Sequence, residues 1–403
     1  MRLLLRARLG LAPALAALAL LAGCGNSGEP PRAERPLIVQ DDAELLYRDD
    51  ARSAAAVASL KQAGVDWARV SAGWSFIAPA PTAPRRPAFD AADPDAYPPG
   101  AWTPLDRAVR LARAAGLEVM IDIASWAPRW AVTRAVAPLE RPRWGIDAVE
   151  FGRFAQAVAR RYGDRARAYA IWNEPNYGVF LLPQWRTGPG GLQPASPDAY
   201  RAMLYAAAPV IRAAAPGALV LIGNTAPAGE ARPTSVLETV PPLRFLRELA
   251  CVDAALRPVR TGACASFRPL PGDGWAHHPY PPRGAPPQTS DPDPDDVPVA
   301  DLGRLTGLLT RLGRAGRTER TLPVYVTEFG YQTNPPNPTA PVTPAQQARY
   351  TLAARDLAFA DPAVRSFSQF LIRDLPENAG GFRFADGRPK PLFEALRRAA
   401  DRG

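Results

Sequence analysis

The chain is poor in the residues that most often bind metals. Among its 403 residues there are two histidines, three cysteines and three methionines. The histidines are adjacent, at His277 and His278, and no cysteine lies near them, so a zinc site is not expected there. No glycine-rich phosphate loop follows the first apolar run. We therefore expect neither a metal nor another cofactor.

The N-terminus lacks an apolar run long enough to span a membrane comfortably. Three arginines precede a stretch of 15 residues from Leu9 to Gly23, which Pro13 interrupts. This order predicts a secretory signal peptide at residues 1–23. The tetrapeptide Leu21-Ala22-Gly23-Cys24 resembles the lipobox of bacterial lipoproteins, which implies cleavage before Cys24 and lipidation of its thiol. An ordinary signal peptide cleaved nearby is the alternative.

The residues after the leader point to an exported protein. Residues 24–36 show no apolar periodicity and are expected to form a flexible tether. We expect the chain to be anchored by its lipid to the bacterial cell envelope, with no other contact with the membrane. In an oxidising compartment Cys251 and Cys264 can close a short loop as a disulfide, and two buried free thiols are the alternative.

Lysine is almost absent, since Lys61 and Lys390 are the only two and the other basic residues are arginines. No basic run contains interleaved aromatic residues, so binding to nucleic acid is not expected. The formal net charge is +9, and the leader contributes three arginines and no acid, which leaves +6. We interpret this excess as compositional bias, and an acidic polysaccharide remains an open alternative as a ligand.

From residue 37 to residue 403 the chain alternates between two patterns. Helical spacing separates eight short apolar runs, as in a single (β/α)8 TIM barrel of the α/β class with long loops after the strands. An open doubly wound sheet is the alternative, but it calls for the missing phosphate loop. The predicted strands are 37–40, 67–72, 117–124, 168–172, 218–223, 274–278, 323–328 and 367–372. The predicted helices are 51–63, 105–115, 148–161, 200–214, 242–256, 299–315, 344–359 and 391–402.

Two of the apolar runs end on a glutamate. Glu174 follows the fourth run in "AYAIWNEPN", and Glu328 ends the seventh in "PVYVTE". In a barrel both would lie at the carboxyl ends of the strands, where ligands bind. Two carboxyl groups held about 5–5.5 Å apart, one protonated and one ionised, are the arrangement of a retaining glycosidase.

The contexts of these glutamates resemble those in clan A, the large clan of (β/α)8 glycoside hydrolases. "WNEPN" at 172–176 resembles the motif of the fourth strand, and "VTEFG" at 326–330 resembles that of the seventh. The chain is similar to the cellulase-like family 5 and the β-xylosidase-like family 39, from about residue 37 to the C-terminus. The resemblance implies a retaining hydrolase of β-linked poly- or oligosaccharides, with Glu174 as acid/base and Glu328 as nucleophile.

The same resemblance assigns supporting roles. Asn173 would bond the 2-hydroxyl of the sugar, and His278-Pro279-Tyr280 fits the clan's His-x-Tyr pattern. Tyr280 would then donate to the nucleophile, and His278 would lie near the acid/base. Arg69 matches an arginine beside the nucleophile, where a fixed positive charge lowers the pKa of a carboxyl group. A surface position is the alternative for Arg69, and no role is expected for His277.

Aromatic residues that follow the strands are candidates for stacking on sugar faces. We select Trp74, Trp126 and Tyr331 as substrate-binding platforms, whereas Trp172 is equally compatible with the core. Many clan members carry a tryptophan at the end of strand eight, and this chain has none there, so Phe370 or Arg373 is expected in its place.

Two other functions remain open on sequence grounds. A non-catalytic carbohydrate-binding lipoprotein could use a barrel that has lost its activity, but both glutamates and Asn173 are present. A transglycosylase would use the same residues as a hydrolase. No internal repeat or heptad pattern stands out, and we expect one catalytic domain that acts as a monomer.

Overall fold

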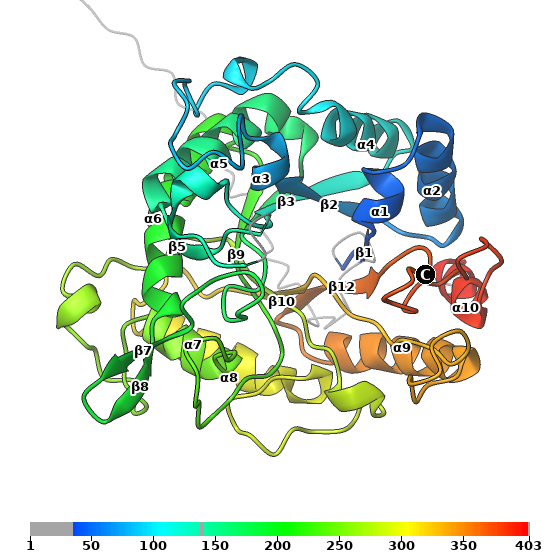
Figure 1. Ribbon diagram of the computed structural model, residues 1–403. Helices are drawn as coiled ribbons and strands as arrows, with labels where there is room; N and C mark the ends of the chain where they lie inside the picture. Colours follow the sequence, from blue (N-terminus) through cyan, green and yellow to red (C-terminus); the bar gives the residue numbers. More distant parts are fainter. Residues whose placement is uncertain (1–34, 138–140, 402–403) are drawn as a thin grey trace, which may run out of the picture. The chain divides into compact units, whose positions relative to one another are not determined.

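Eight apolar runs form eight parallel strands that close into a barrel, as the computed structural model of the chain shows (Figure 1). The structure describes residues 35–137 and 141–401. The predicted signal peptide, Cys24 and most of the tether lie outside these residues. In chain order the barrel strands are β1 (Leu37–Gln40), β2 (Trp67–Gly73), β3 (Glu118–Ala124), β6 (Ala168–Ile171), β9 (Leu219–Thr225), β10 (Gly274–His277), β11 (Val324–Val326) and β12 (Val364–Phe370).

Each barrel strand is followed by a helix that packs outside the barrel (Figure 1). These are α2 (Asp50–Gln62), α4 (Thr103–Ala114), α5 (Ala148–Tyr162), α6 (Ser196–Ala214), α7 (Pro242–Leu249), α8 (Leu302–Arg314), α9 (Pro344–Phe359) and α10 (Pro391–Ala400). Two further helices of one turn each, α1 (Asp42–Leu45) and α3 (Trp74–Ile77), directly follow β1 and β2. The predicted (β/α)8 barrel is thereby confirmed. Of the described helices, none is both long enough and apolar enough to cross a bilayer.

Side chains inside the barrel are separated from those that face the helices. Consecutive strand residues such as Ile38 and Val39 belong to different apolar clusters, because successive side chains of a strand point to opposite faces. The small cluster holds Ile38, Trp67, Met120, Ala168, Ala170, Leu221 and Ala276, and the large one fills the layer between strands and helices. Strands buried on both faces explain why their sequences are continuous apolar runs.

Helix starts are fixed by side chains that the sequence places correctly. Asp49 accepts a hydrogen bond from the backbone N–H of Arg52, and Asp147 caps α5 in the same way. Thr343 and Gln346 form a capping box at α9. The helix predicted over 242–256 is shorter, because α7 ends at Leu249 and the backbone turns at Cys251, where φ is 52°. Cys251 is joined to Cys264 by a disulfide.

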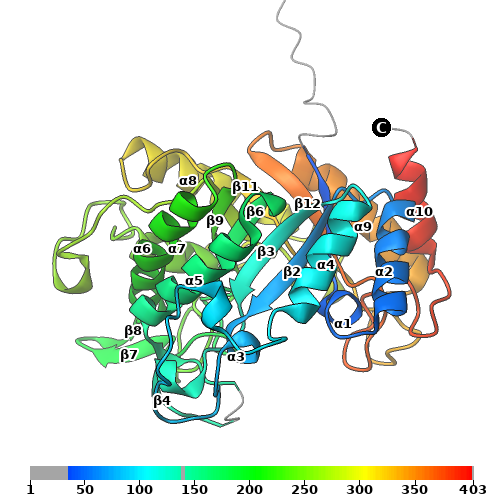
Figure 2. The same ribbon diagram turned by 90° about the horizontal axis from the view of Figure 1, so that it is seen from above.

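The loops that follow the strands carry elements that the sequence does not predict. β4 (Val132–Arg134) pairs with β5 (Trp144–Ile146), and β7 (Trp185–Gly188) pairs with β8 (Gly191–Pro194). These hairpins are too short to show a period of two in the sequence. Figure 2 shows β4, β7, β8 and α3 at one end of the barrel, where the strands have their carboxyl ends.

Candidate active site

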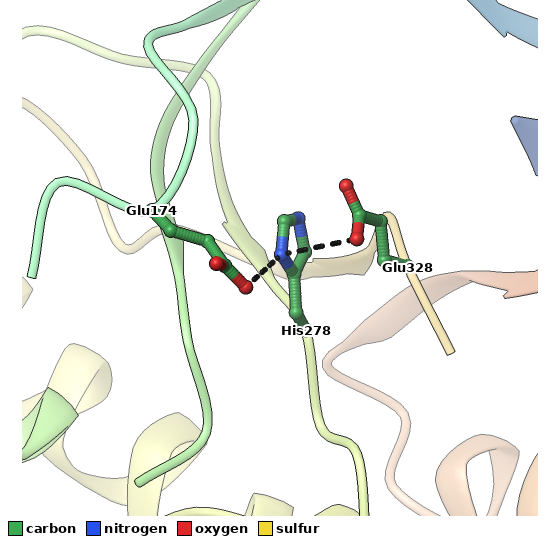
Figure 3. A group of neighbouring side chains, drawn as sticks. All are labelled: Glu174, His278 and Glu328. Atoms are coloured by element: carbon green, nitrogen blue, oxygen red, sulfur yellow. Dashed lines mark hydrogen bonds and ion pairs between the residues drawn. The ribbon is translucent and has the colours of Figure 1, made fainter. Parts of the chain in front are cut away.

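Three side chains meet at the carboxyl ends of the barrel strands. Glu174 follows β6, His278 follows β10 and Glu328 follows β11, and His278 lies between the two glutamates (Figure 3). Nδ1 of His278 is 2.9 Å from Oε1 of Glu174 and 3.7 Å from Oε2 of Glu328. One ring nitrogen of His278 and one carboxylate oxygen of each glutamate all lie within 4.8 Å of one another. The two carboxylates therefore approach each other to within that distance.

The backbone at this end of the barrel is strained. Trp172, Glu174 and Asn224 have φ values of 63°, 39° and 51°, in the left-handed region that residues other than glycine rarely adopt. The strain is supported by hydrogen bonds between strands, including one from Glu174 N–H to the carbonyl of Asn224 at 2.9 Å. Such outliers cluster at functional sites, where the surrounding structure can hold them.

Glu328 is surrounded by donors and positive charge. Arg69 donates from Nη1 to Oε1 at 2.6 Å, and the Tyr280 hydroxyl donates to Oε2 at 3.1 Å. Burial by itself raises the pKa of the Glu328 carboxyl, but the charges of protonated His278 and of Arg69, with these hydrogen bonds, lower it below its ordinary value. Since both oxygens already accept from Arg69 and Tyr280, the group is better suited to stay an anion than to bind a cation.

Glu174 has the opposite environment. Burial raises the pKa of its carboxyl group, the charge of Glu328 adds to this, and a protonated His278 offsets it only in part. No arginine or tyrosine among the described residues donates to Glu174. At a pH where Glu328 is ionised, Glu174 can therefore still hold its proton, which separates a nucleophile from an acid.

Arg69 connects Glu328 to two buried polar groups. Its Nη2 donates to Asp122 at 2.7 Å and to Oδ1 of Asn173 at 3.0 Å, and the arginine is completely buried. Burial raises the pKa of Asp122 to about 6 although the Arg69 charge opposes the shift. Asp122 was not predicted from the sequence. It is a lone aspartate inside the apolar run of β3, and a buried charge needs a partner, so its position could have indicated a buried ion pair.

Asn224 on β9 was also missed, and it sets the protonation of His278. Its amide nitrogen donates to the carbonyl of Trp172 at 2.8 Å, which leaves Oδ1 to face Nε2 of His278 at 3.0 Å. Because an amide oxygen can only accept, Nε2 must carry a proton. Nδ1 is then the nitrogen that shares a proton with Glu174. In the sequence, Asn224 could have been recognised as a polar amide near the end of the apolar run "LVLIGNT".

His277 has hydrogen-bond partners other than the two glutamates. It is buried, and its Nε2 lies 2.8 Å from the carbonyl of Val297, which can only accept. Its Nδ1 therefore accepts from the hydroxyl of Thr225 at 2.8 Å. Burial lowers the pKa of His277 to about 3, so it stays neutral and joins β9 and β10 to the loop after β10.

Two of the three aromatic platforms expected from the sequence are not available to a sugar. Trp74 is 1% exposed and stacks on Phe154 at 5.7 Å, in the layer between strands and helices. Tyr331 is 2% exposed, packs against Phe329, and donates its hydroxyl to the carbonyl of Ala285. The predictions for Trp74 and Tyr331 are therefore wrong, because both rings are almost completely buried.

Tyr331 lines part of a cavity next to Tyr280. The cavity has a volume of about 390 Å³ and is also lined by Tyr280, Phe370, Gln332 and Asn378. Phe370 packs edge-on against Tyr280, whereas Arg373 pairs with Glu44. Of the two candidates for the missing strand-eight tryptophan, Phe370 is thus the one beside the site.

Trp126 remains a candidate platform. It follows β3, is half-buried, and stacks on Phe180 with ring centroids 6.1 Å apart. Its indole nitrogen donates to the carbonyl of Val179 at 3.2 Å, and the Arg141 guanidinium lies 4.6 Å from its ring centroid.

The model of the family described as cellulase (glycosyl hydrolase family 5) matches residues 39–281, more than half of the chain. The match includes Glu174, His278 and Tyr280 and ends before Glu328. Comparison with the curated proteins gave no match.

Solved structures with the same fold include several glycosidases. A family 39 glycoside hydrolase from the gut symbiont Bacteroides cellulosilyticus WH2 is 18% identical with a TM-score of 0.57, over 92% of this chain and 64% of that one. The β-glycosidase BGL167 is 15% identical with a TM-score of 0.58, over 93% and 98%. A GH5-4 broad specificity endoglucanase from Clostridium acetobutylicum is 13% identical with a TM-score of 0.53, over 92% and 97%. At these identities the likeness shows the fold alone, and the chain spans less than two thirds of the family 39 protein. The family match decides the assignment: the chain belongs to the cellulase family, glycosyl hydrolase family 5, and is a glycosidase.

Proposed function

We propose that the protein is a retaining glycoside hydrolase that cleaves β-O-glycosidic bonds of a poly- or oligosaccharide. The observation that carries the proposal is the approach of the Glu174 and Glu328 carboxylates to within 4.8 Å. Retaining enzymes hold the two groups about 5–5.5 Å apart, whereas inverting enzymes leave about 6.5–9.5 Å for a water molecule. The separation observed here is closer to the retaining range than to the inverting range, which supports the proposal.

In the first step Glu328 attacks the anomeric carbon and forms an ester bond to the sugar. The bond to the leaving oxygen breaks, and Glu174 gives that oxygen its proton, so the leaving group departs as a neutral alcohol. The lowered pKa of Glu328 keeps the attacking group ionised, and the raised pKa of Glu174 keeps its proton available. In the second step Glu174 takes a proton from water, which hydrolyses the ester with retained configuration.

The neighbours supply positioning for both steps. Tyr280 and Arg69 hold the two oxygens of Glu328, and the Tyr280 bond must shift when one oxygen becomes the ester. Nδ1 of His278, whose own ring proton lies on Nε2, is 2.9 Å from Glu174 and orients the protonated carboxyl group by accepting from it. Oδ1 of Asn173 faces Arg69, which leaves its amide nitrogen free to donate to a sugar hydroxyl.

The configuration of the first product tests this mechanism. The purified protein is incubated with a panel of aryl β-glycosides and β-linked polysaccharides, and proton NMR follows the anomer that appears before mutarotation. We expect the β-anomer from a β-linked substrate. A first product with the α-configuration would contradict double displacement, and activity on no β-glycoside would contradict the substrate class.

We also propose that the enzyme is exported and attached to the cell envelope through lipid on Cys24. The arginines, the apolar stretch and the Leu-Ala-Gly-Cys order support this proposal, and the Cys251–Cys264 disulfide fits an oxidising compartment. Mass spectrometry of the protein from its host should find an N-terminus at Cys24 with added acyl mass. A water-soluble protein that begins elsewhere would contradict it.

A further inference from the structure

The cavity next to Tyr280 is lined by an arginine that has no acidic partner in the described chain. This residue, Arg283, lies in the loop after β10 and is exposed. Its guanidinium makes no hydrogen bond, ion pair or contact with an aromatic ring among the described residues. Acids are near in the sequence, but Asp295 and Asp301 pair with other arginines. The charge of Arg283 is therefore available to a ligand.

The backbone holds Arg283 at the cavity at a cost in strain. Its φ and ψ angles are 45° and 34°, in the left-handed region that residues other than glycine rarely adopt. A Cβ on Gly284 would lie 2.8 Å from Cγ of Pro341, so the loop after β10 packs closely on the loop after β11. The Tyr331 hydroxyl joins the same two loops, since it donates to the carbonyl of Ala285 at 3.1 Å. Strain that the surroundings support in this way is typical of functional sites.

Two amide groups of the same cavity wall have N–H donors to spare. The Thr339 N–H donates to Oδ1 of Asn337 at 3.0 Å, which orients Asn337 so that its Nδ2 donates to Oε1 of Gln332 at 2.9 Å. The Gly380 N–H donates to Oδ1 of Asn378 at 2.9 Å. The amide oxygens of Gln332 and Asn378 thus already accept from the protein, whereas their NH2 groups have no acceptor in the part of the chain that the structure describes.

This lining favours an anionic group over a neutral one. No aspartate or glutamate is among the described residues that line the cavity. Glu328, which Tyr280 contacts, is paired with Arg69 at 2.6 Å, so its charge is balanced. A sugar hydroxyl both donates and accepts, whereas an ionised carboxylate or sulfate only accepts, and a guanidinium can bond two of its oxygens at once.

We propose that this cavity is an anion subsite, in which Arg283, Gln332 and Asn378 bind an oxyanion that the substrate carries near the bond to be cut. The oxyanion is the carboxylate of a uronic acid or a sulfate ester. Tyr280, which lines the cavity, donates to Glu328, and this contact places the subsite next to the chemistry. The proposal rests on the proposed function and adds the substrate class, an acidic glycan. The net charge of +6 beyond the leader favours the approach of such a polyanion.

Binding of charged and neutral forms of the same glycan tests the anion subsite. Oligosaccharides are prepared from xanthan, hyaluronan and C6-oxidised cellulose, each with its carboxyl-reduced counterpart, and from cellulose sulfate with unmodified cellulose as counterpart. Calorimetry measures their Kd for Glu328→Gln, which should not hydrolyse them, alone and combined with Arg283→Asn, Arg283→Lys or Arg398→Gln. Asparagine tolerates the left-handed backbone and lysine keeps the charge. Arg398 is the matched control, an exposed arginine on α10.

We expect at least one acidic oligosaccharide to bind Glu328→Gln about 3- to 10-fold more tightly than its neutral counterpart. Arg283→Asn should remove this preference, Arg283→Lys should keep part of it, and Arg398→Gln should keep all of it. Preference within the carboxylated or the sulfated series identifies the oxyanion. Binding of no oligosaccharide, equal binding of both forms, a preference that survives Arg283→Asn, or an equal loss with Arg398→Gln would overturn the proposal.

Turnover by the protein with Glu328 intact separates the anion subsite from the proposed function. On an acidic substrate, Arg283→Asn should raise KM about 3- to 10-fold and leave kcat within about twofold, with no change on the carboxyl-reduced form. Binding that depends on Arg283, without hydrolysis, would support the subsite and contradict the proposed function. Hydrolysis with retained configuration and no acidic preference would overturn the subsite alone. Binding of inorganic sulfate that depends on Arg283, with no preference among the glycans, would assign the cavity to a free anion and overturn its role in substrate binding.

Discussion

Glu174 and Glu328 are the same residue type, equally buried, and within 4.8 Å of each other, yet their surroundings make them chemically different. Glu328 accepts from Arg69 and Tyr280, which stabilise its charge. Among the charged or titratable side chains that the structure describes, Glu174 has a hydrogen bond only with His278, so burial dominates and raises the pKa of Glu174. The comparison teaches that two identical carboxyl groups acquire different pKa values because different strands supply the side chains around them.

The largest expected effect comes from removing either carboxylate. Glu328→Gly and Glu174→Gly should each lower kcat by at least about 1000-fold, roughly 4 kcal/mol of barrier, because each step needs both groups. Azide can replace the missing group, and its point of attack distinguishes the two. Rescue of Glu328→Gly should give the inverted glycosyl azide, and rescue of Glu174→Gly the retained one. Exchanged products would reverse the assignment.

The next effect comes from Tyr280→Phe, which removes one donor from Glu328. The Glu328 pKa should rise toward its ordinary value, so the carboxyl is protonated more readily and the acidic limb of the kcat/KM profile moves to higher pH. We expect kcat to fall about 10- to 1000-fold, or roughly 1.4–4 kcal/mol, with KM little changed. A wild-type kcat with an unmoved acidic limb would show that this hydrogen bond has no function.

A smaller effect is expected from Asn224→Gly, which keeps the left-handed backbone conformation but removes the amide. His278 can then place its proton on Nδ1 and donate to the ionised form of Glu174. That contact lowers the Glu174 pKa, so the alkaline limb of the profile should move to lower pH, with kcat reduced about 10-fold. Thr327→Val is the matched control, since it removes only a second donor to the Asn224 oxygen. An alkaline limb that does not move would contradict the tautomer assigned to His278.

Removal of the Cys251–Cys264 disulfide, which lies after α7, is expected to have the smallest effect on the pKa values of the two glutamates. The double variant Cys251→Ser/Cys264→Ser should lose about 2–4 kcal/mol of unfolding free energy, measured by denaturant titration, because its loop is no longer closed. The pH limits of kcat/KM should coincide with those of wild type. A shifted limb would show that the balance between Glu174 and Glu328 depends on packing far from their contacts.

The sequence predicts most of the barrel because a parallel strand buried on both faces is a short continuous apolar run. β6 is of this kind, and the helices between strands begin at recognisable caps such as Asp147 and Thr343. The hairpins β4–β5 and β7–β8 escape prediction because three or four residues carry no detectable period. The end of α7 is missed because the turn at Cys251 depends on tertiary contacts.

The candidate site is predicted only in part, for a related reason. Glu174 and Glu328 are visible because each ends an apolar run with a charge. The direction of a side chain after a strand is not visible, so Trp74 and Trp126 look alike in sequence although one lies in the core and the other at the rim. Asn224 is hard to recognise because its role depends on His278, which is 54 residues away.

Trapping of the covalent intermediate tests the division of labour between the two glutamates most directly. The enzyme is treated with the 2-deoxy-2-fluoro analogue of the best aryl glycoside, which slows hydrolysis of the ester, and the protein is digested and analysed by mass spectrometry. We predict one equivalent of fluorosugar on the peptide that contains Glu328, and none with Glu328→Gln. A fluorosugar attached to Glu174, or turnover of the parent glycoside with an inverted product and no adduct, would contradict the account.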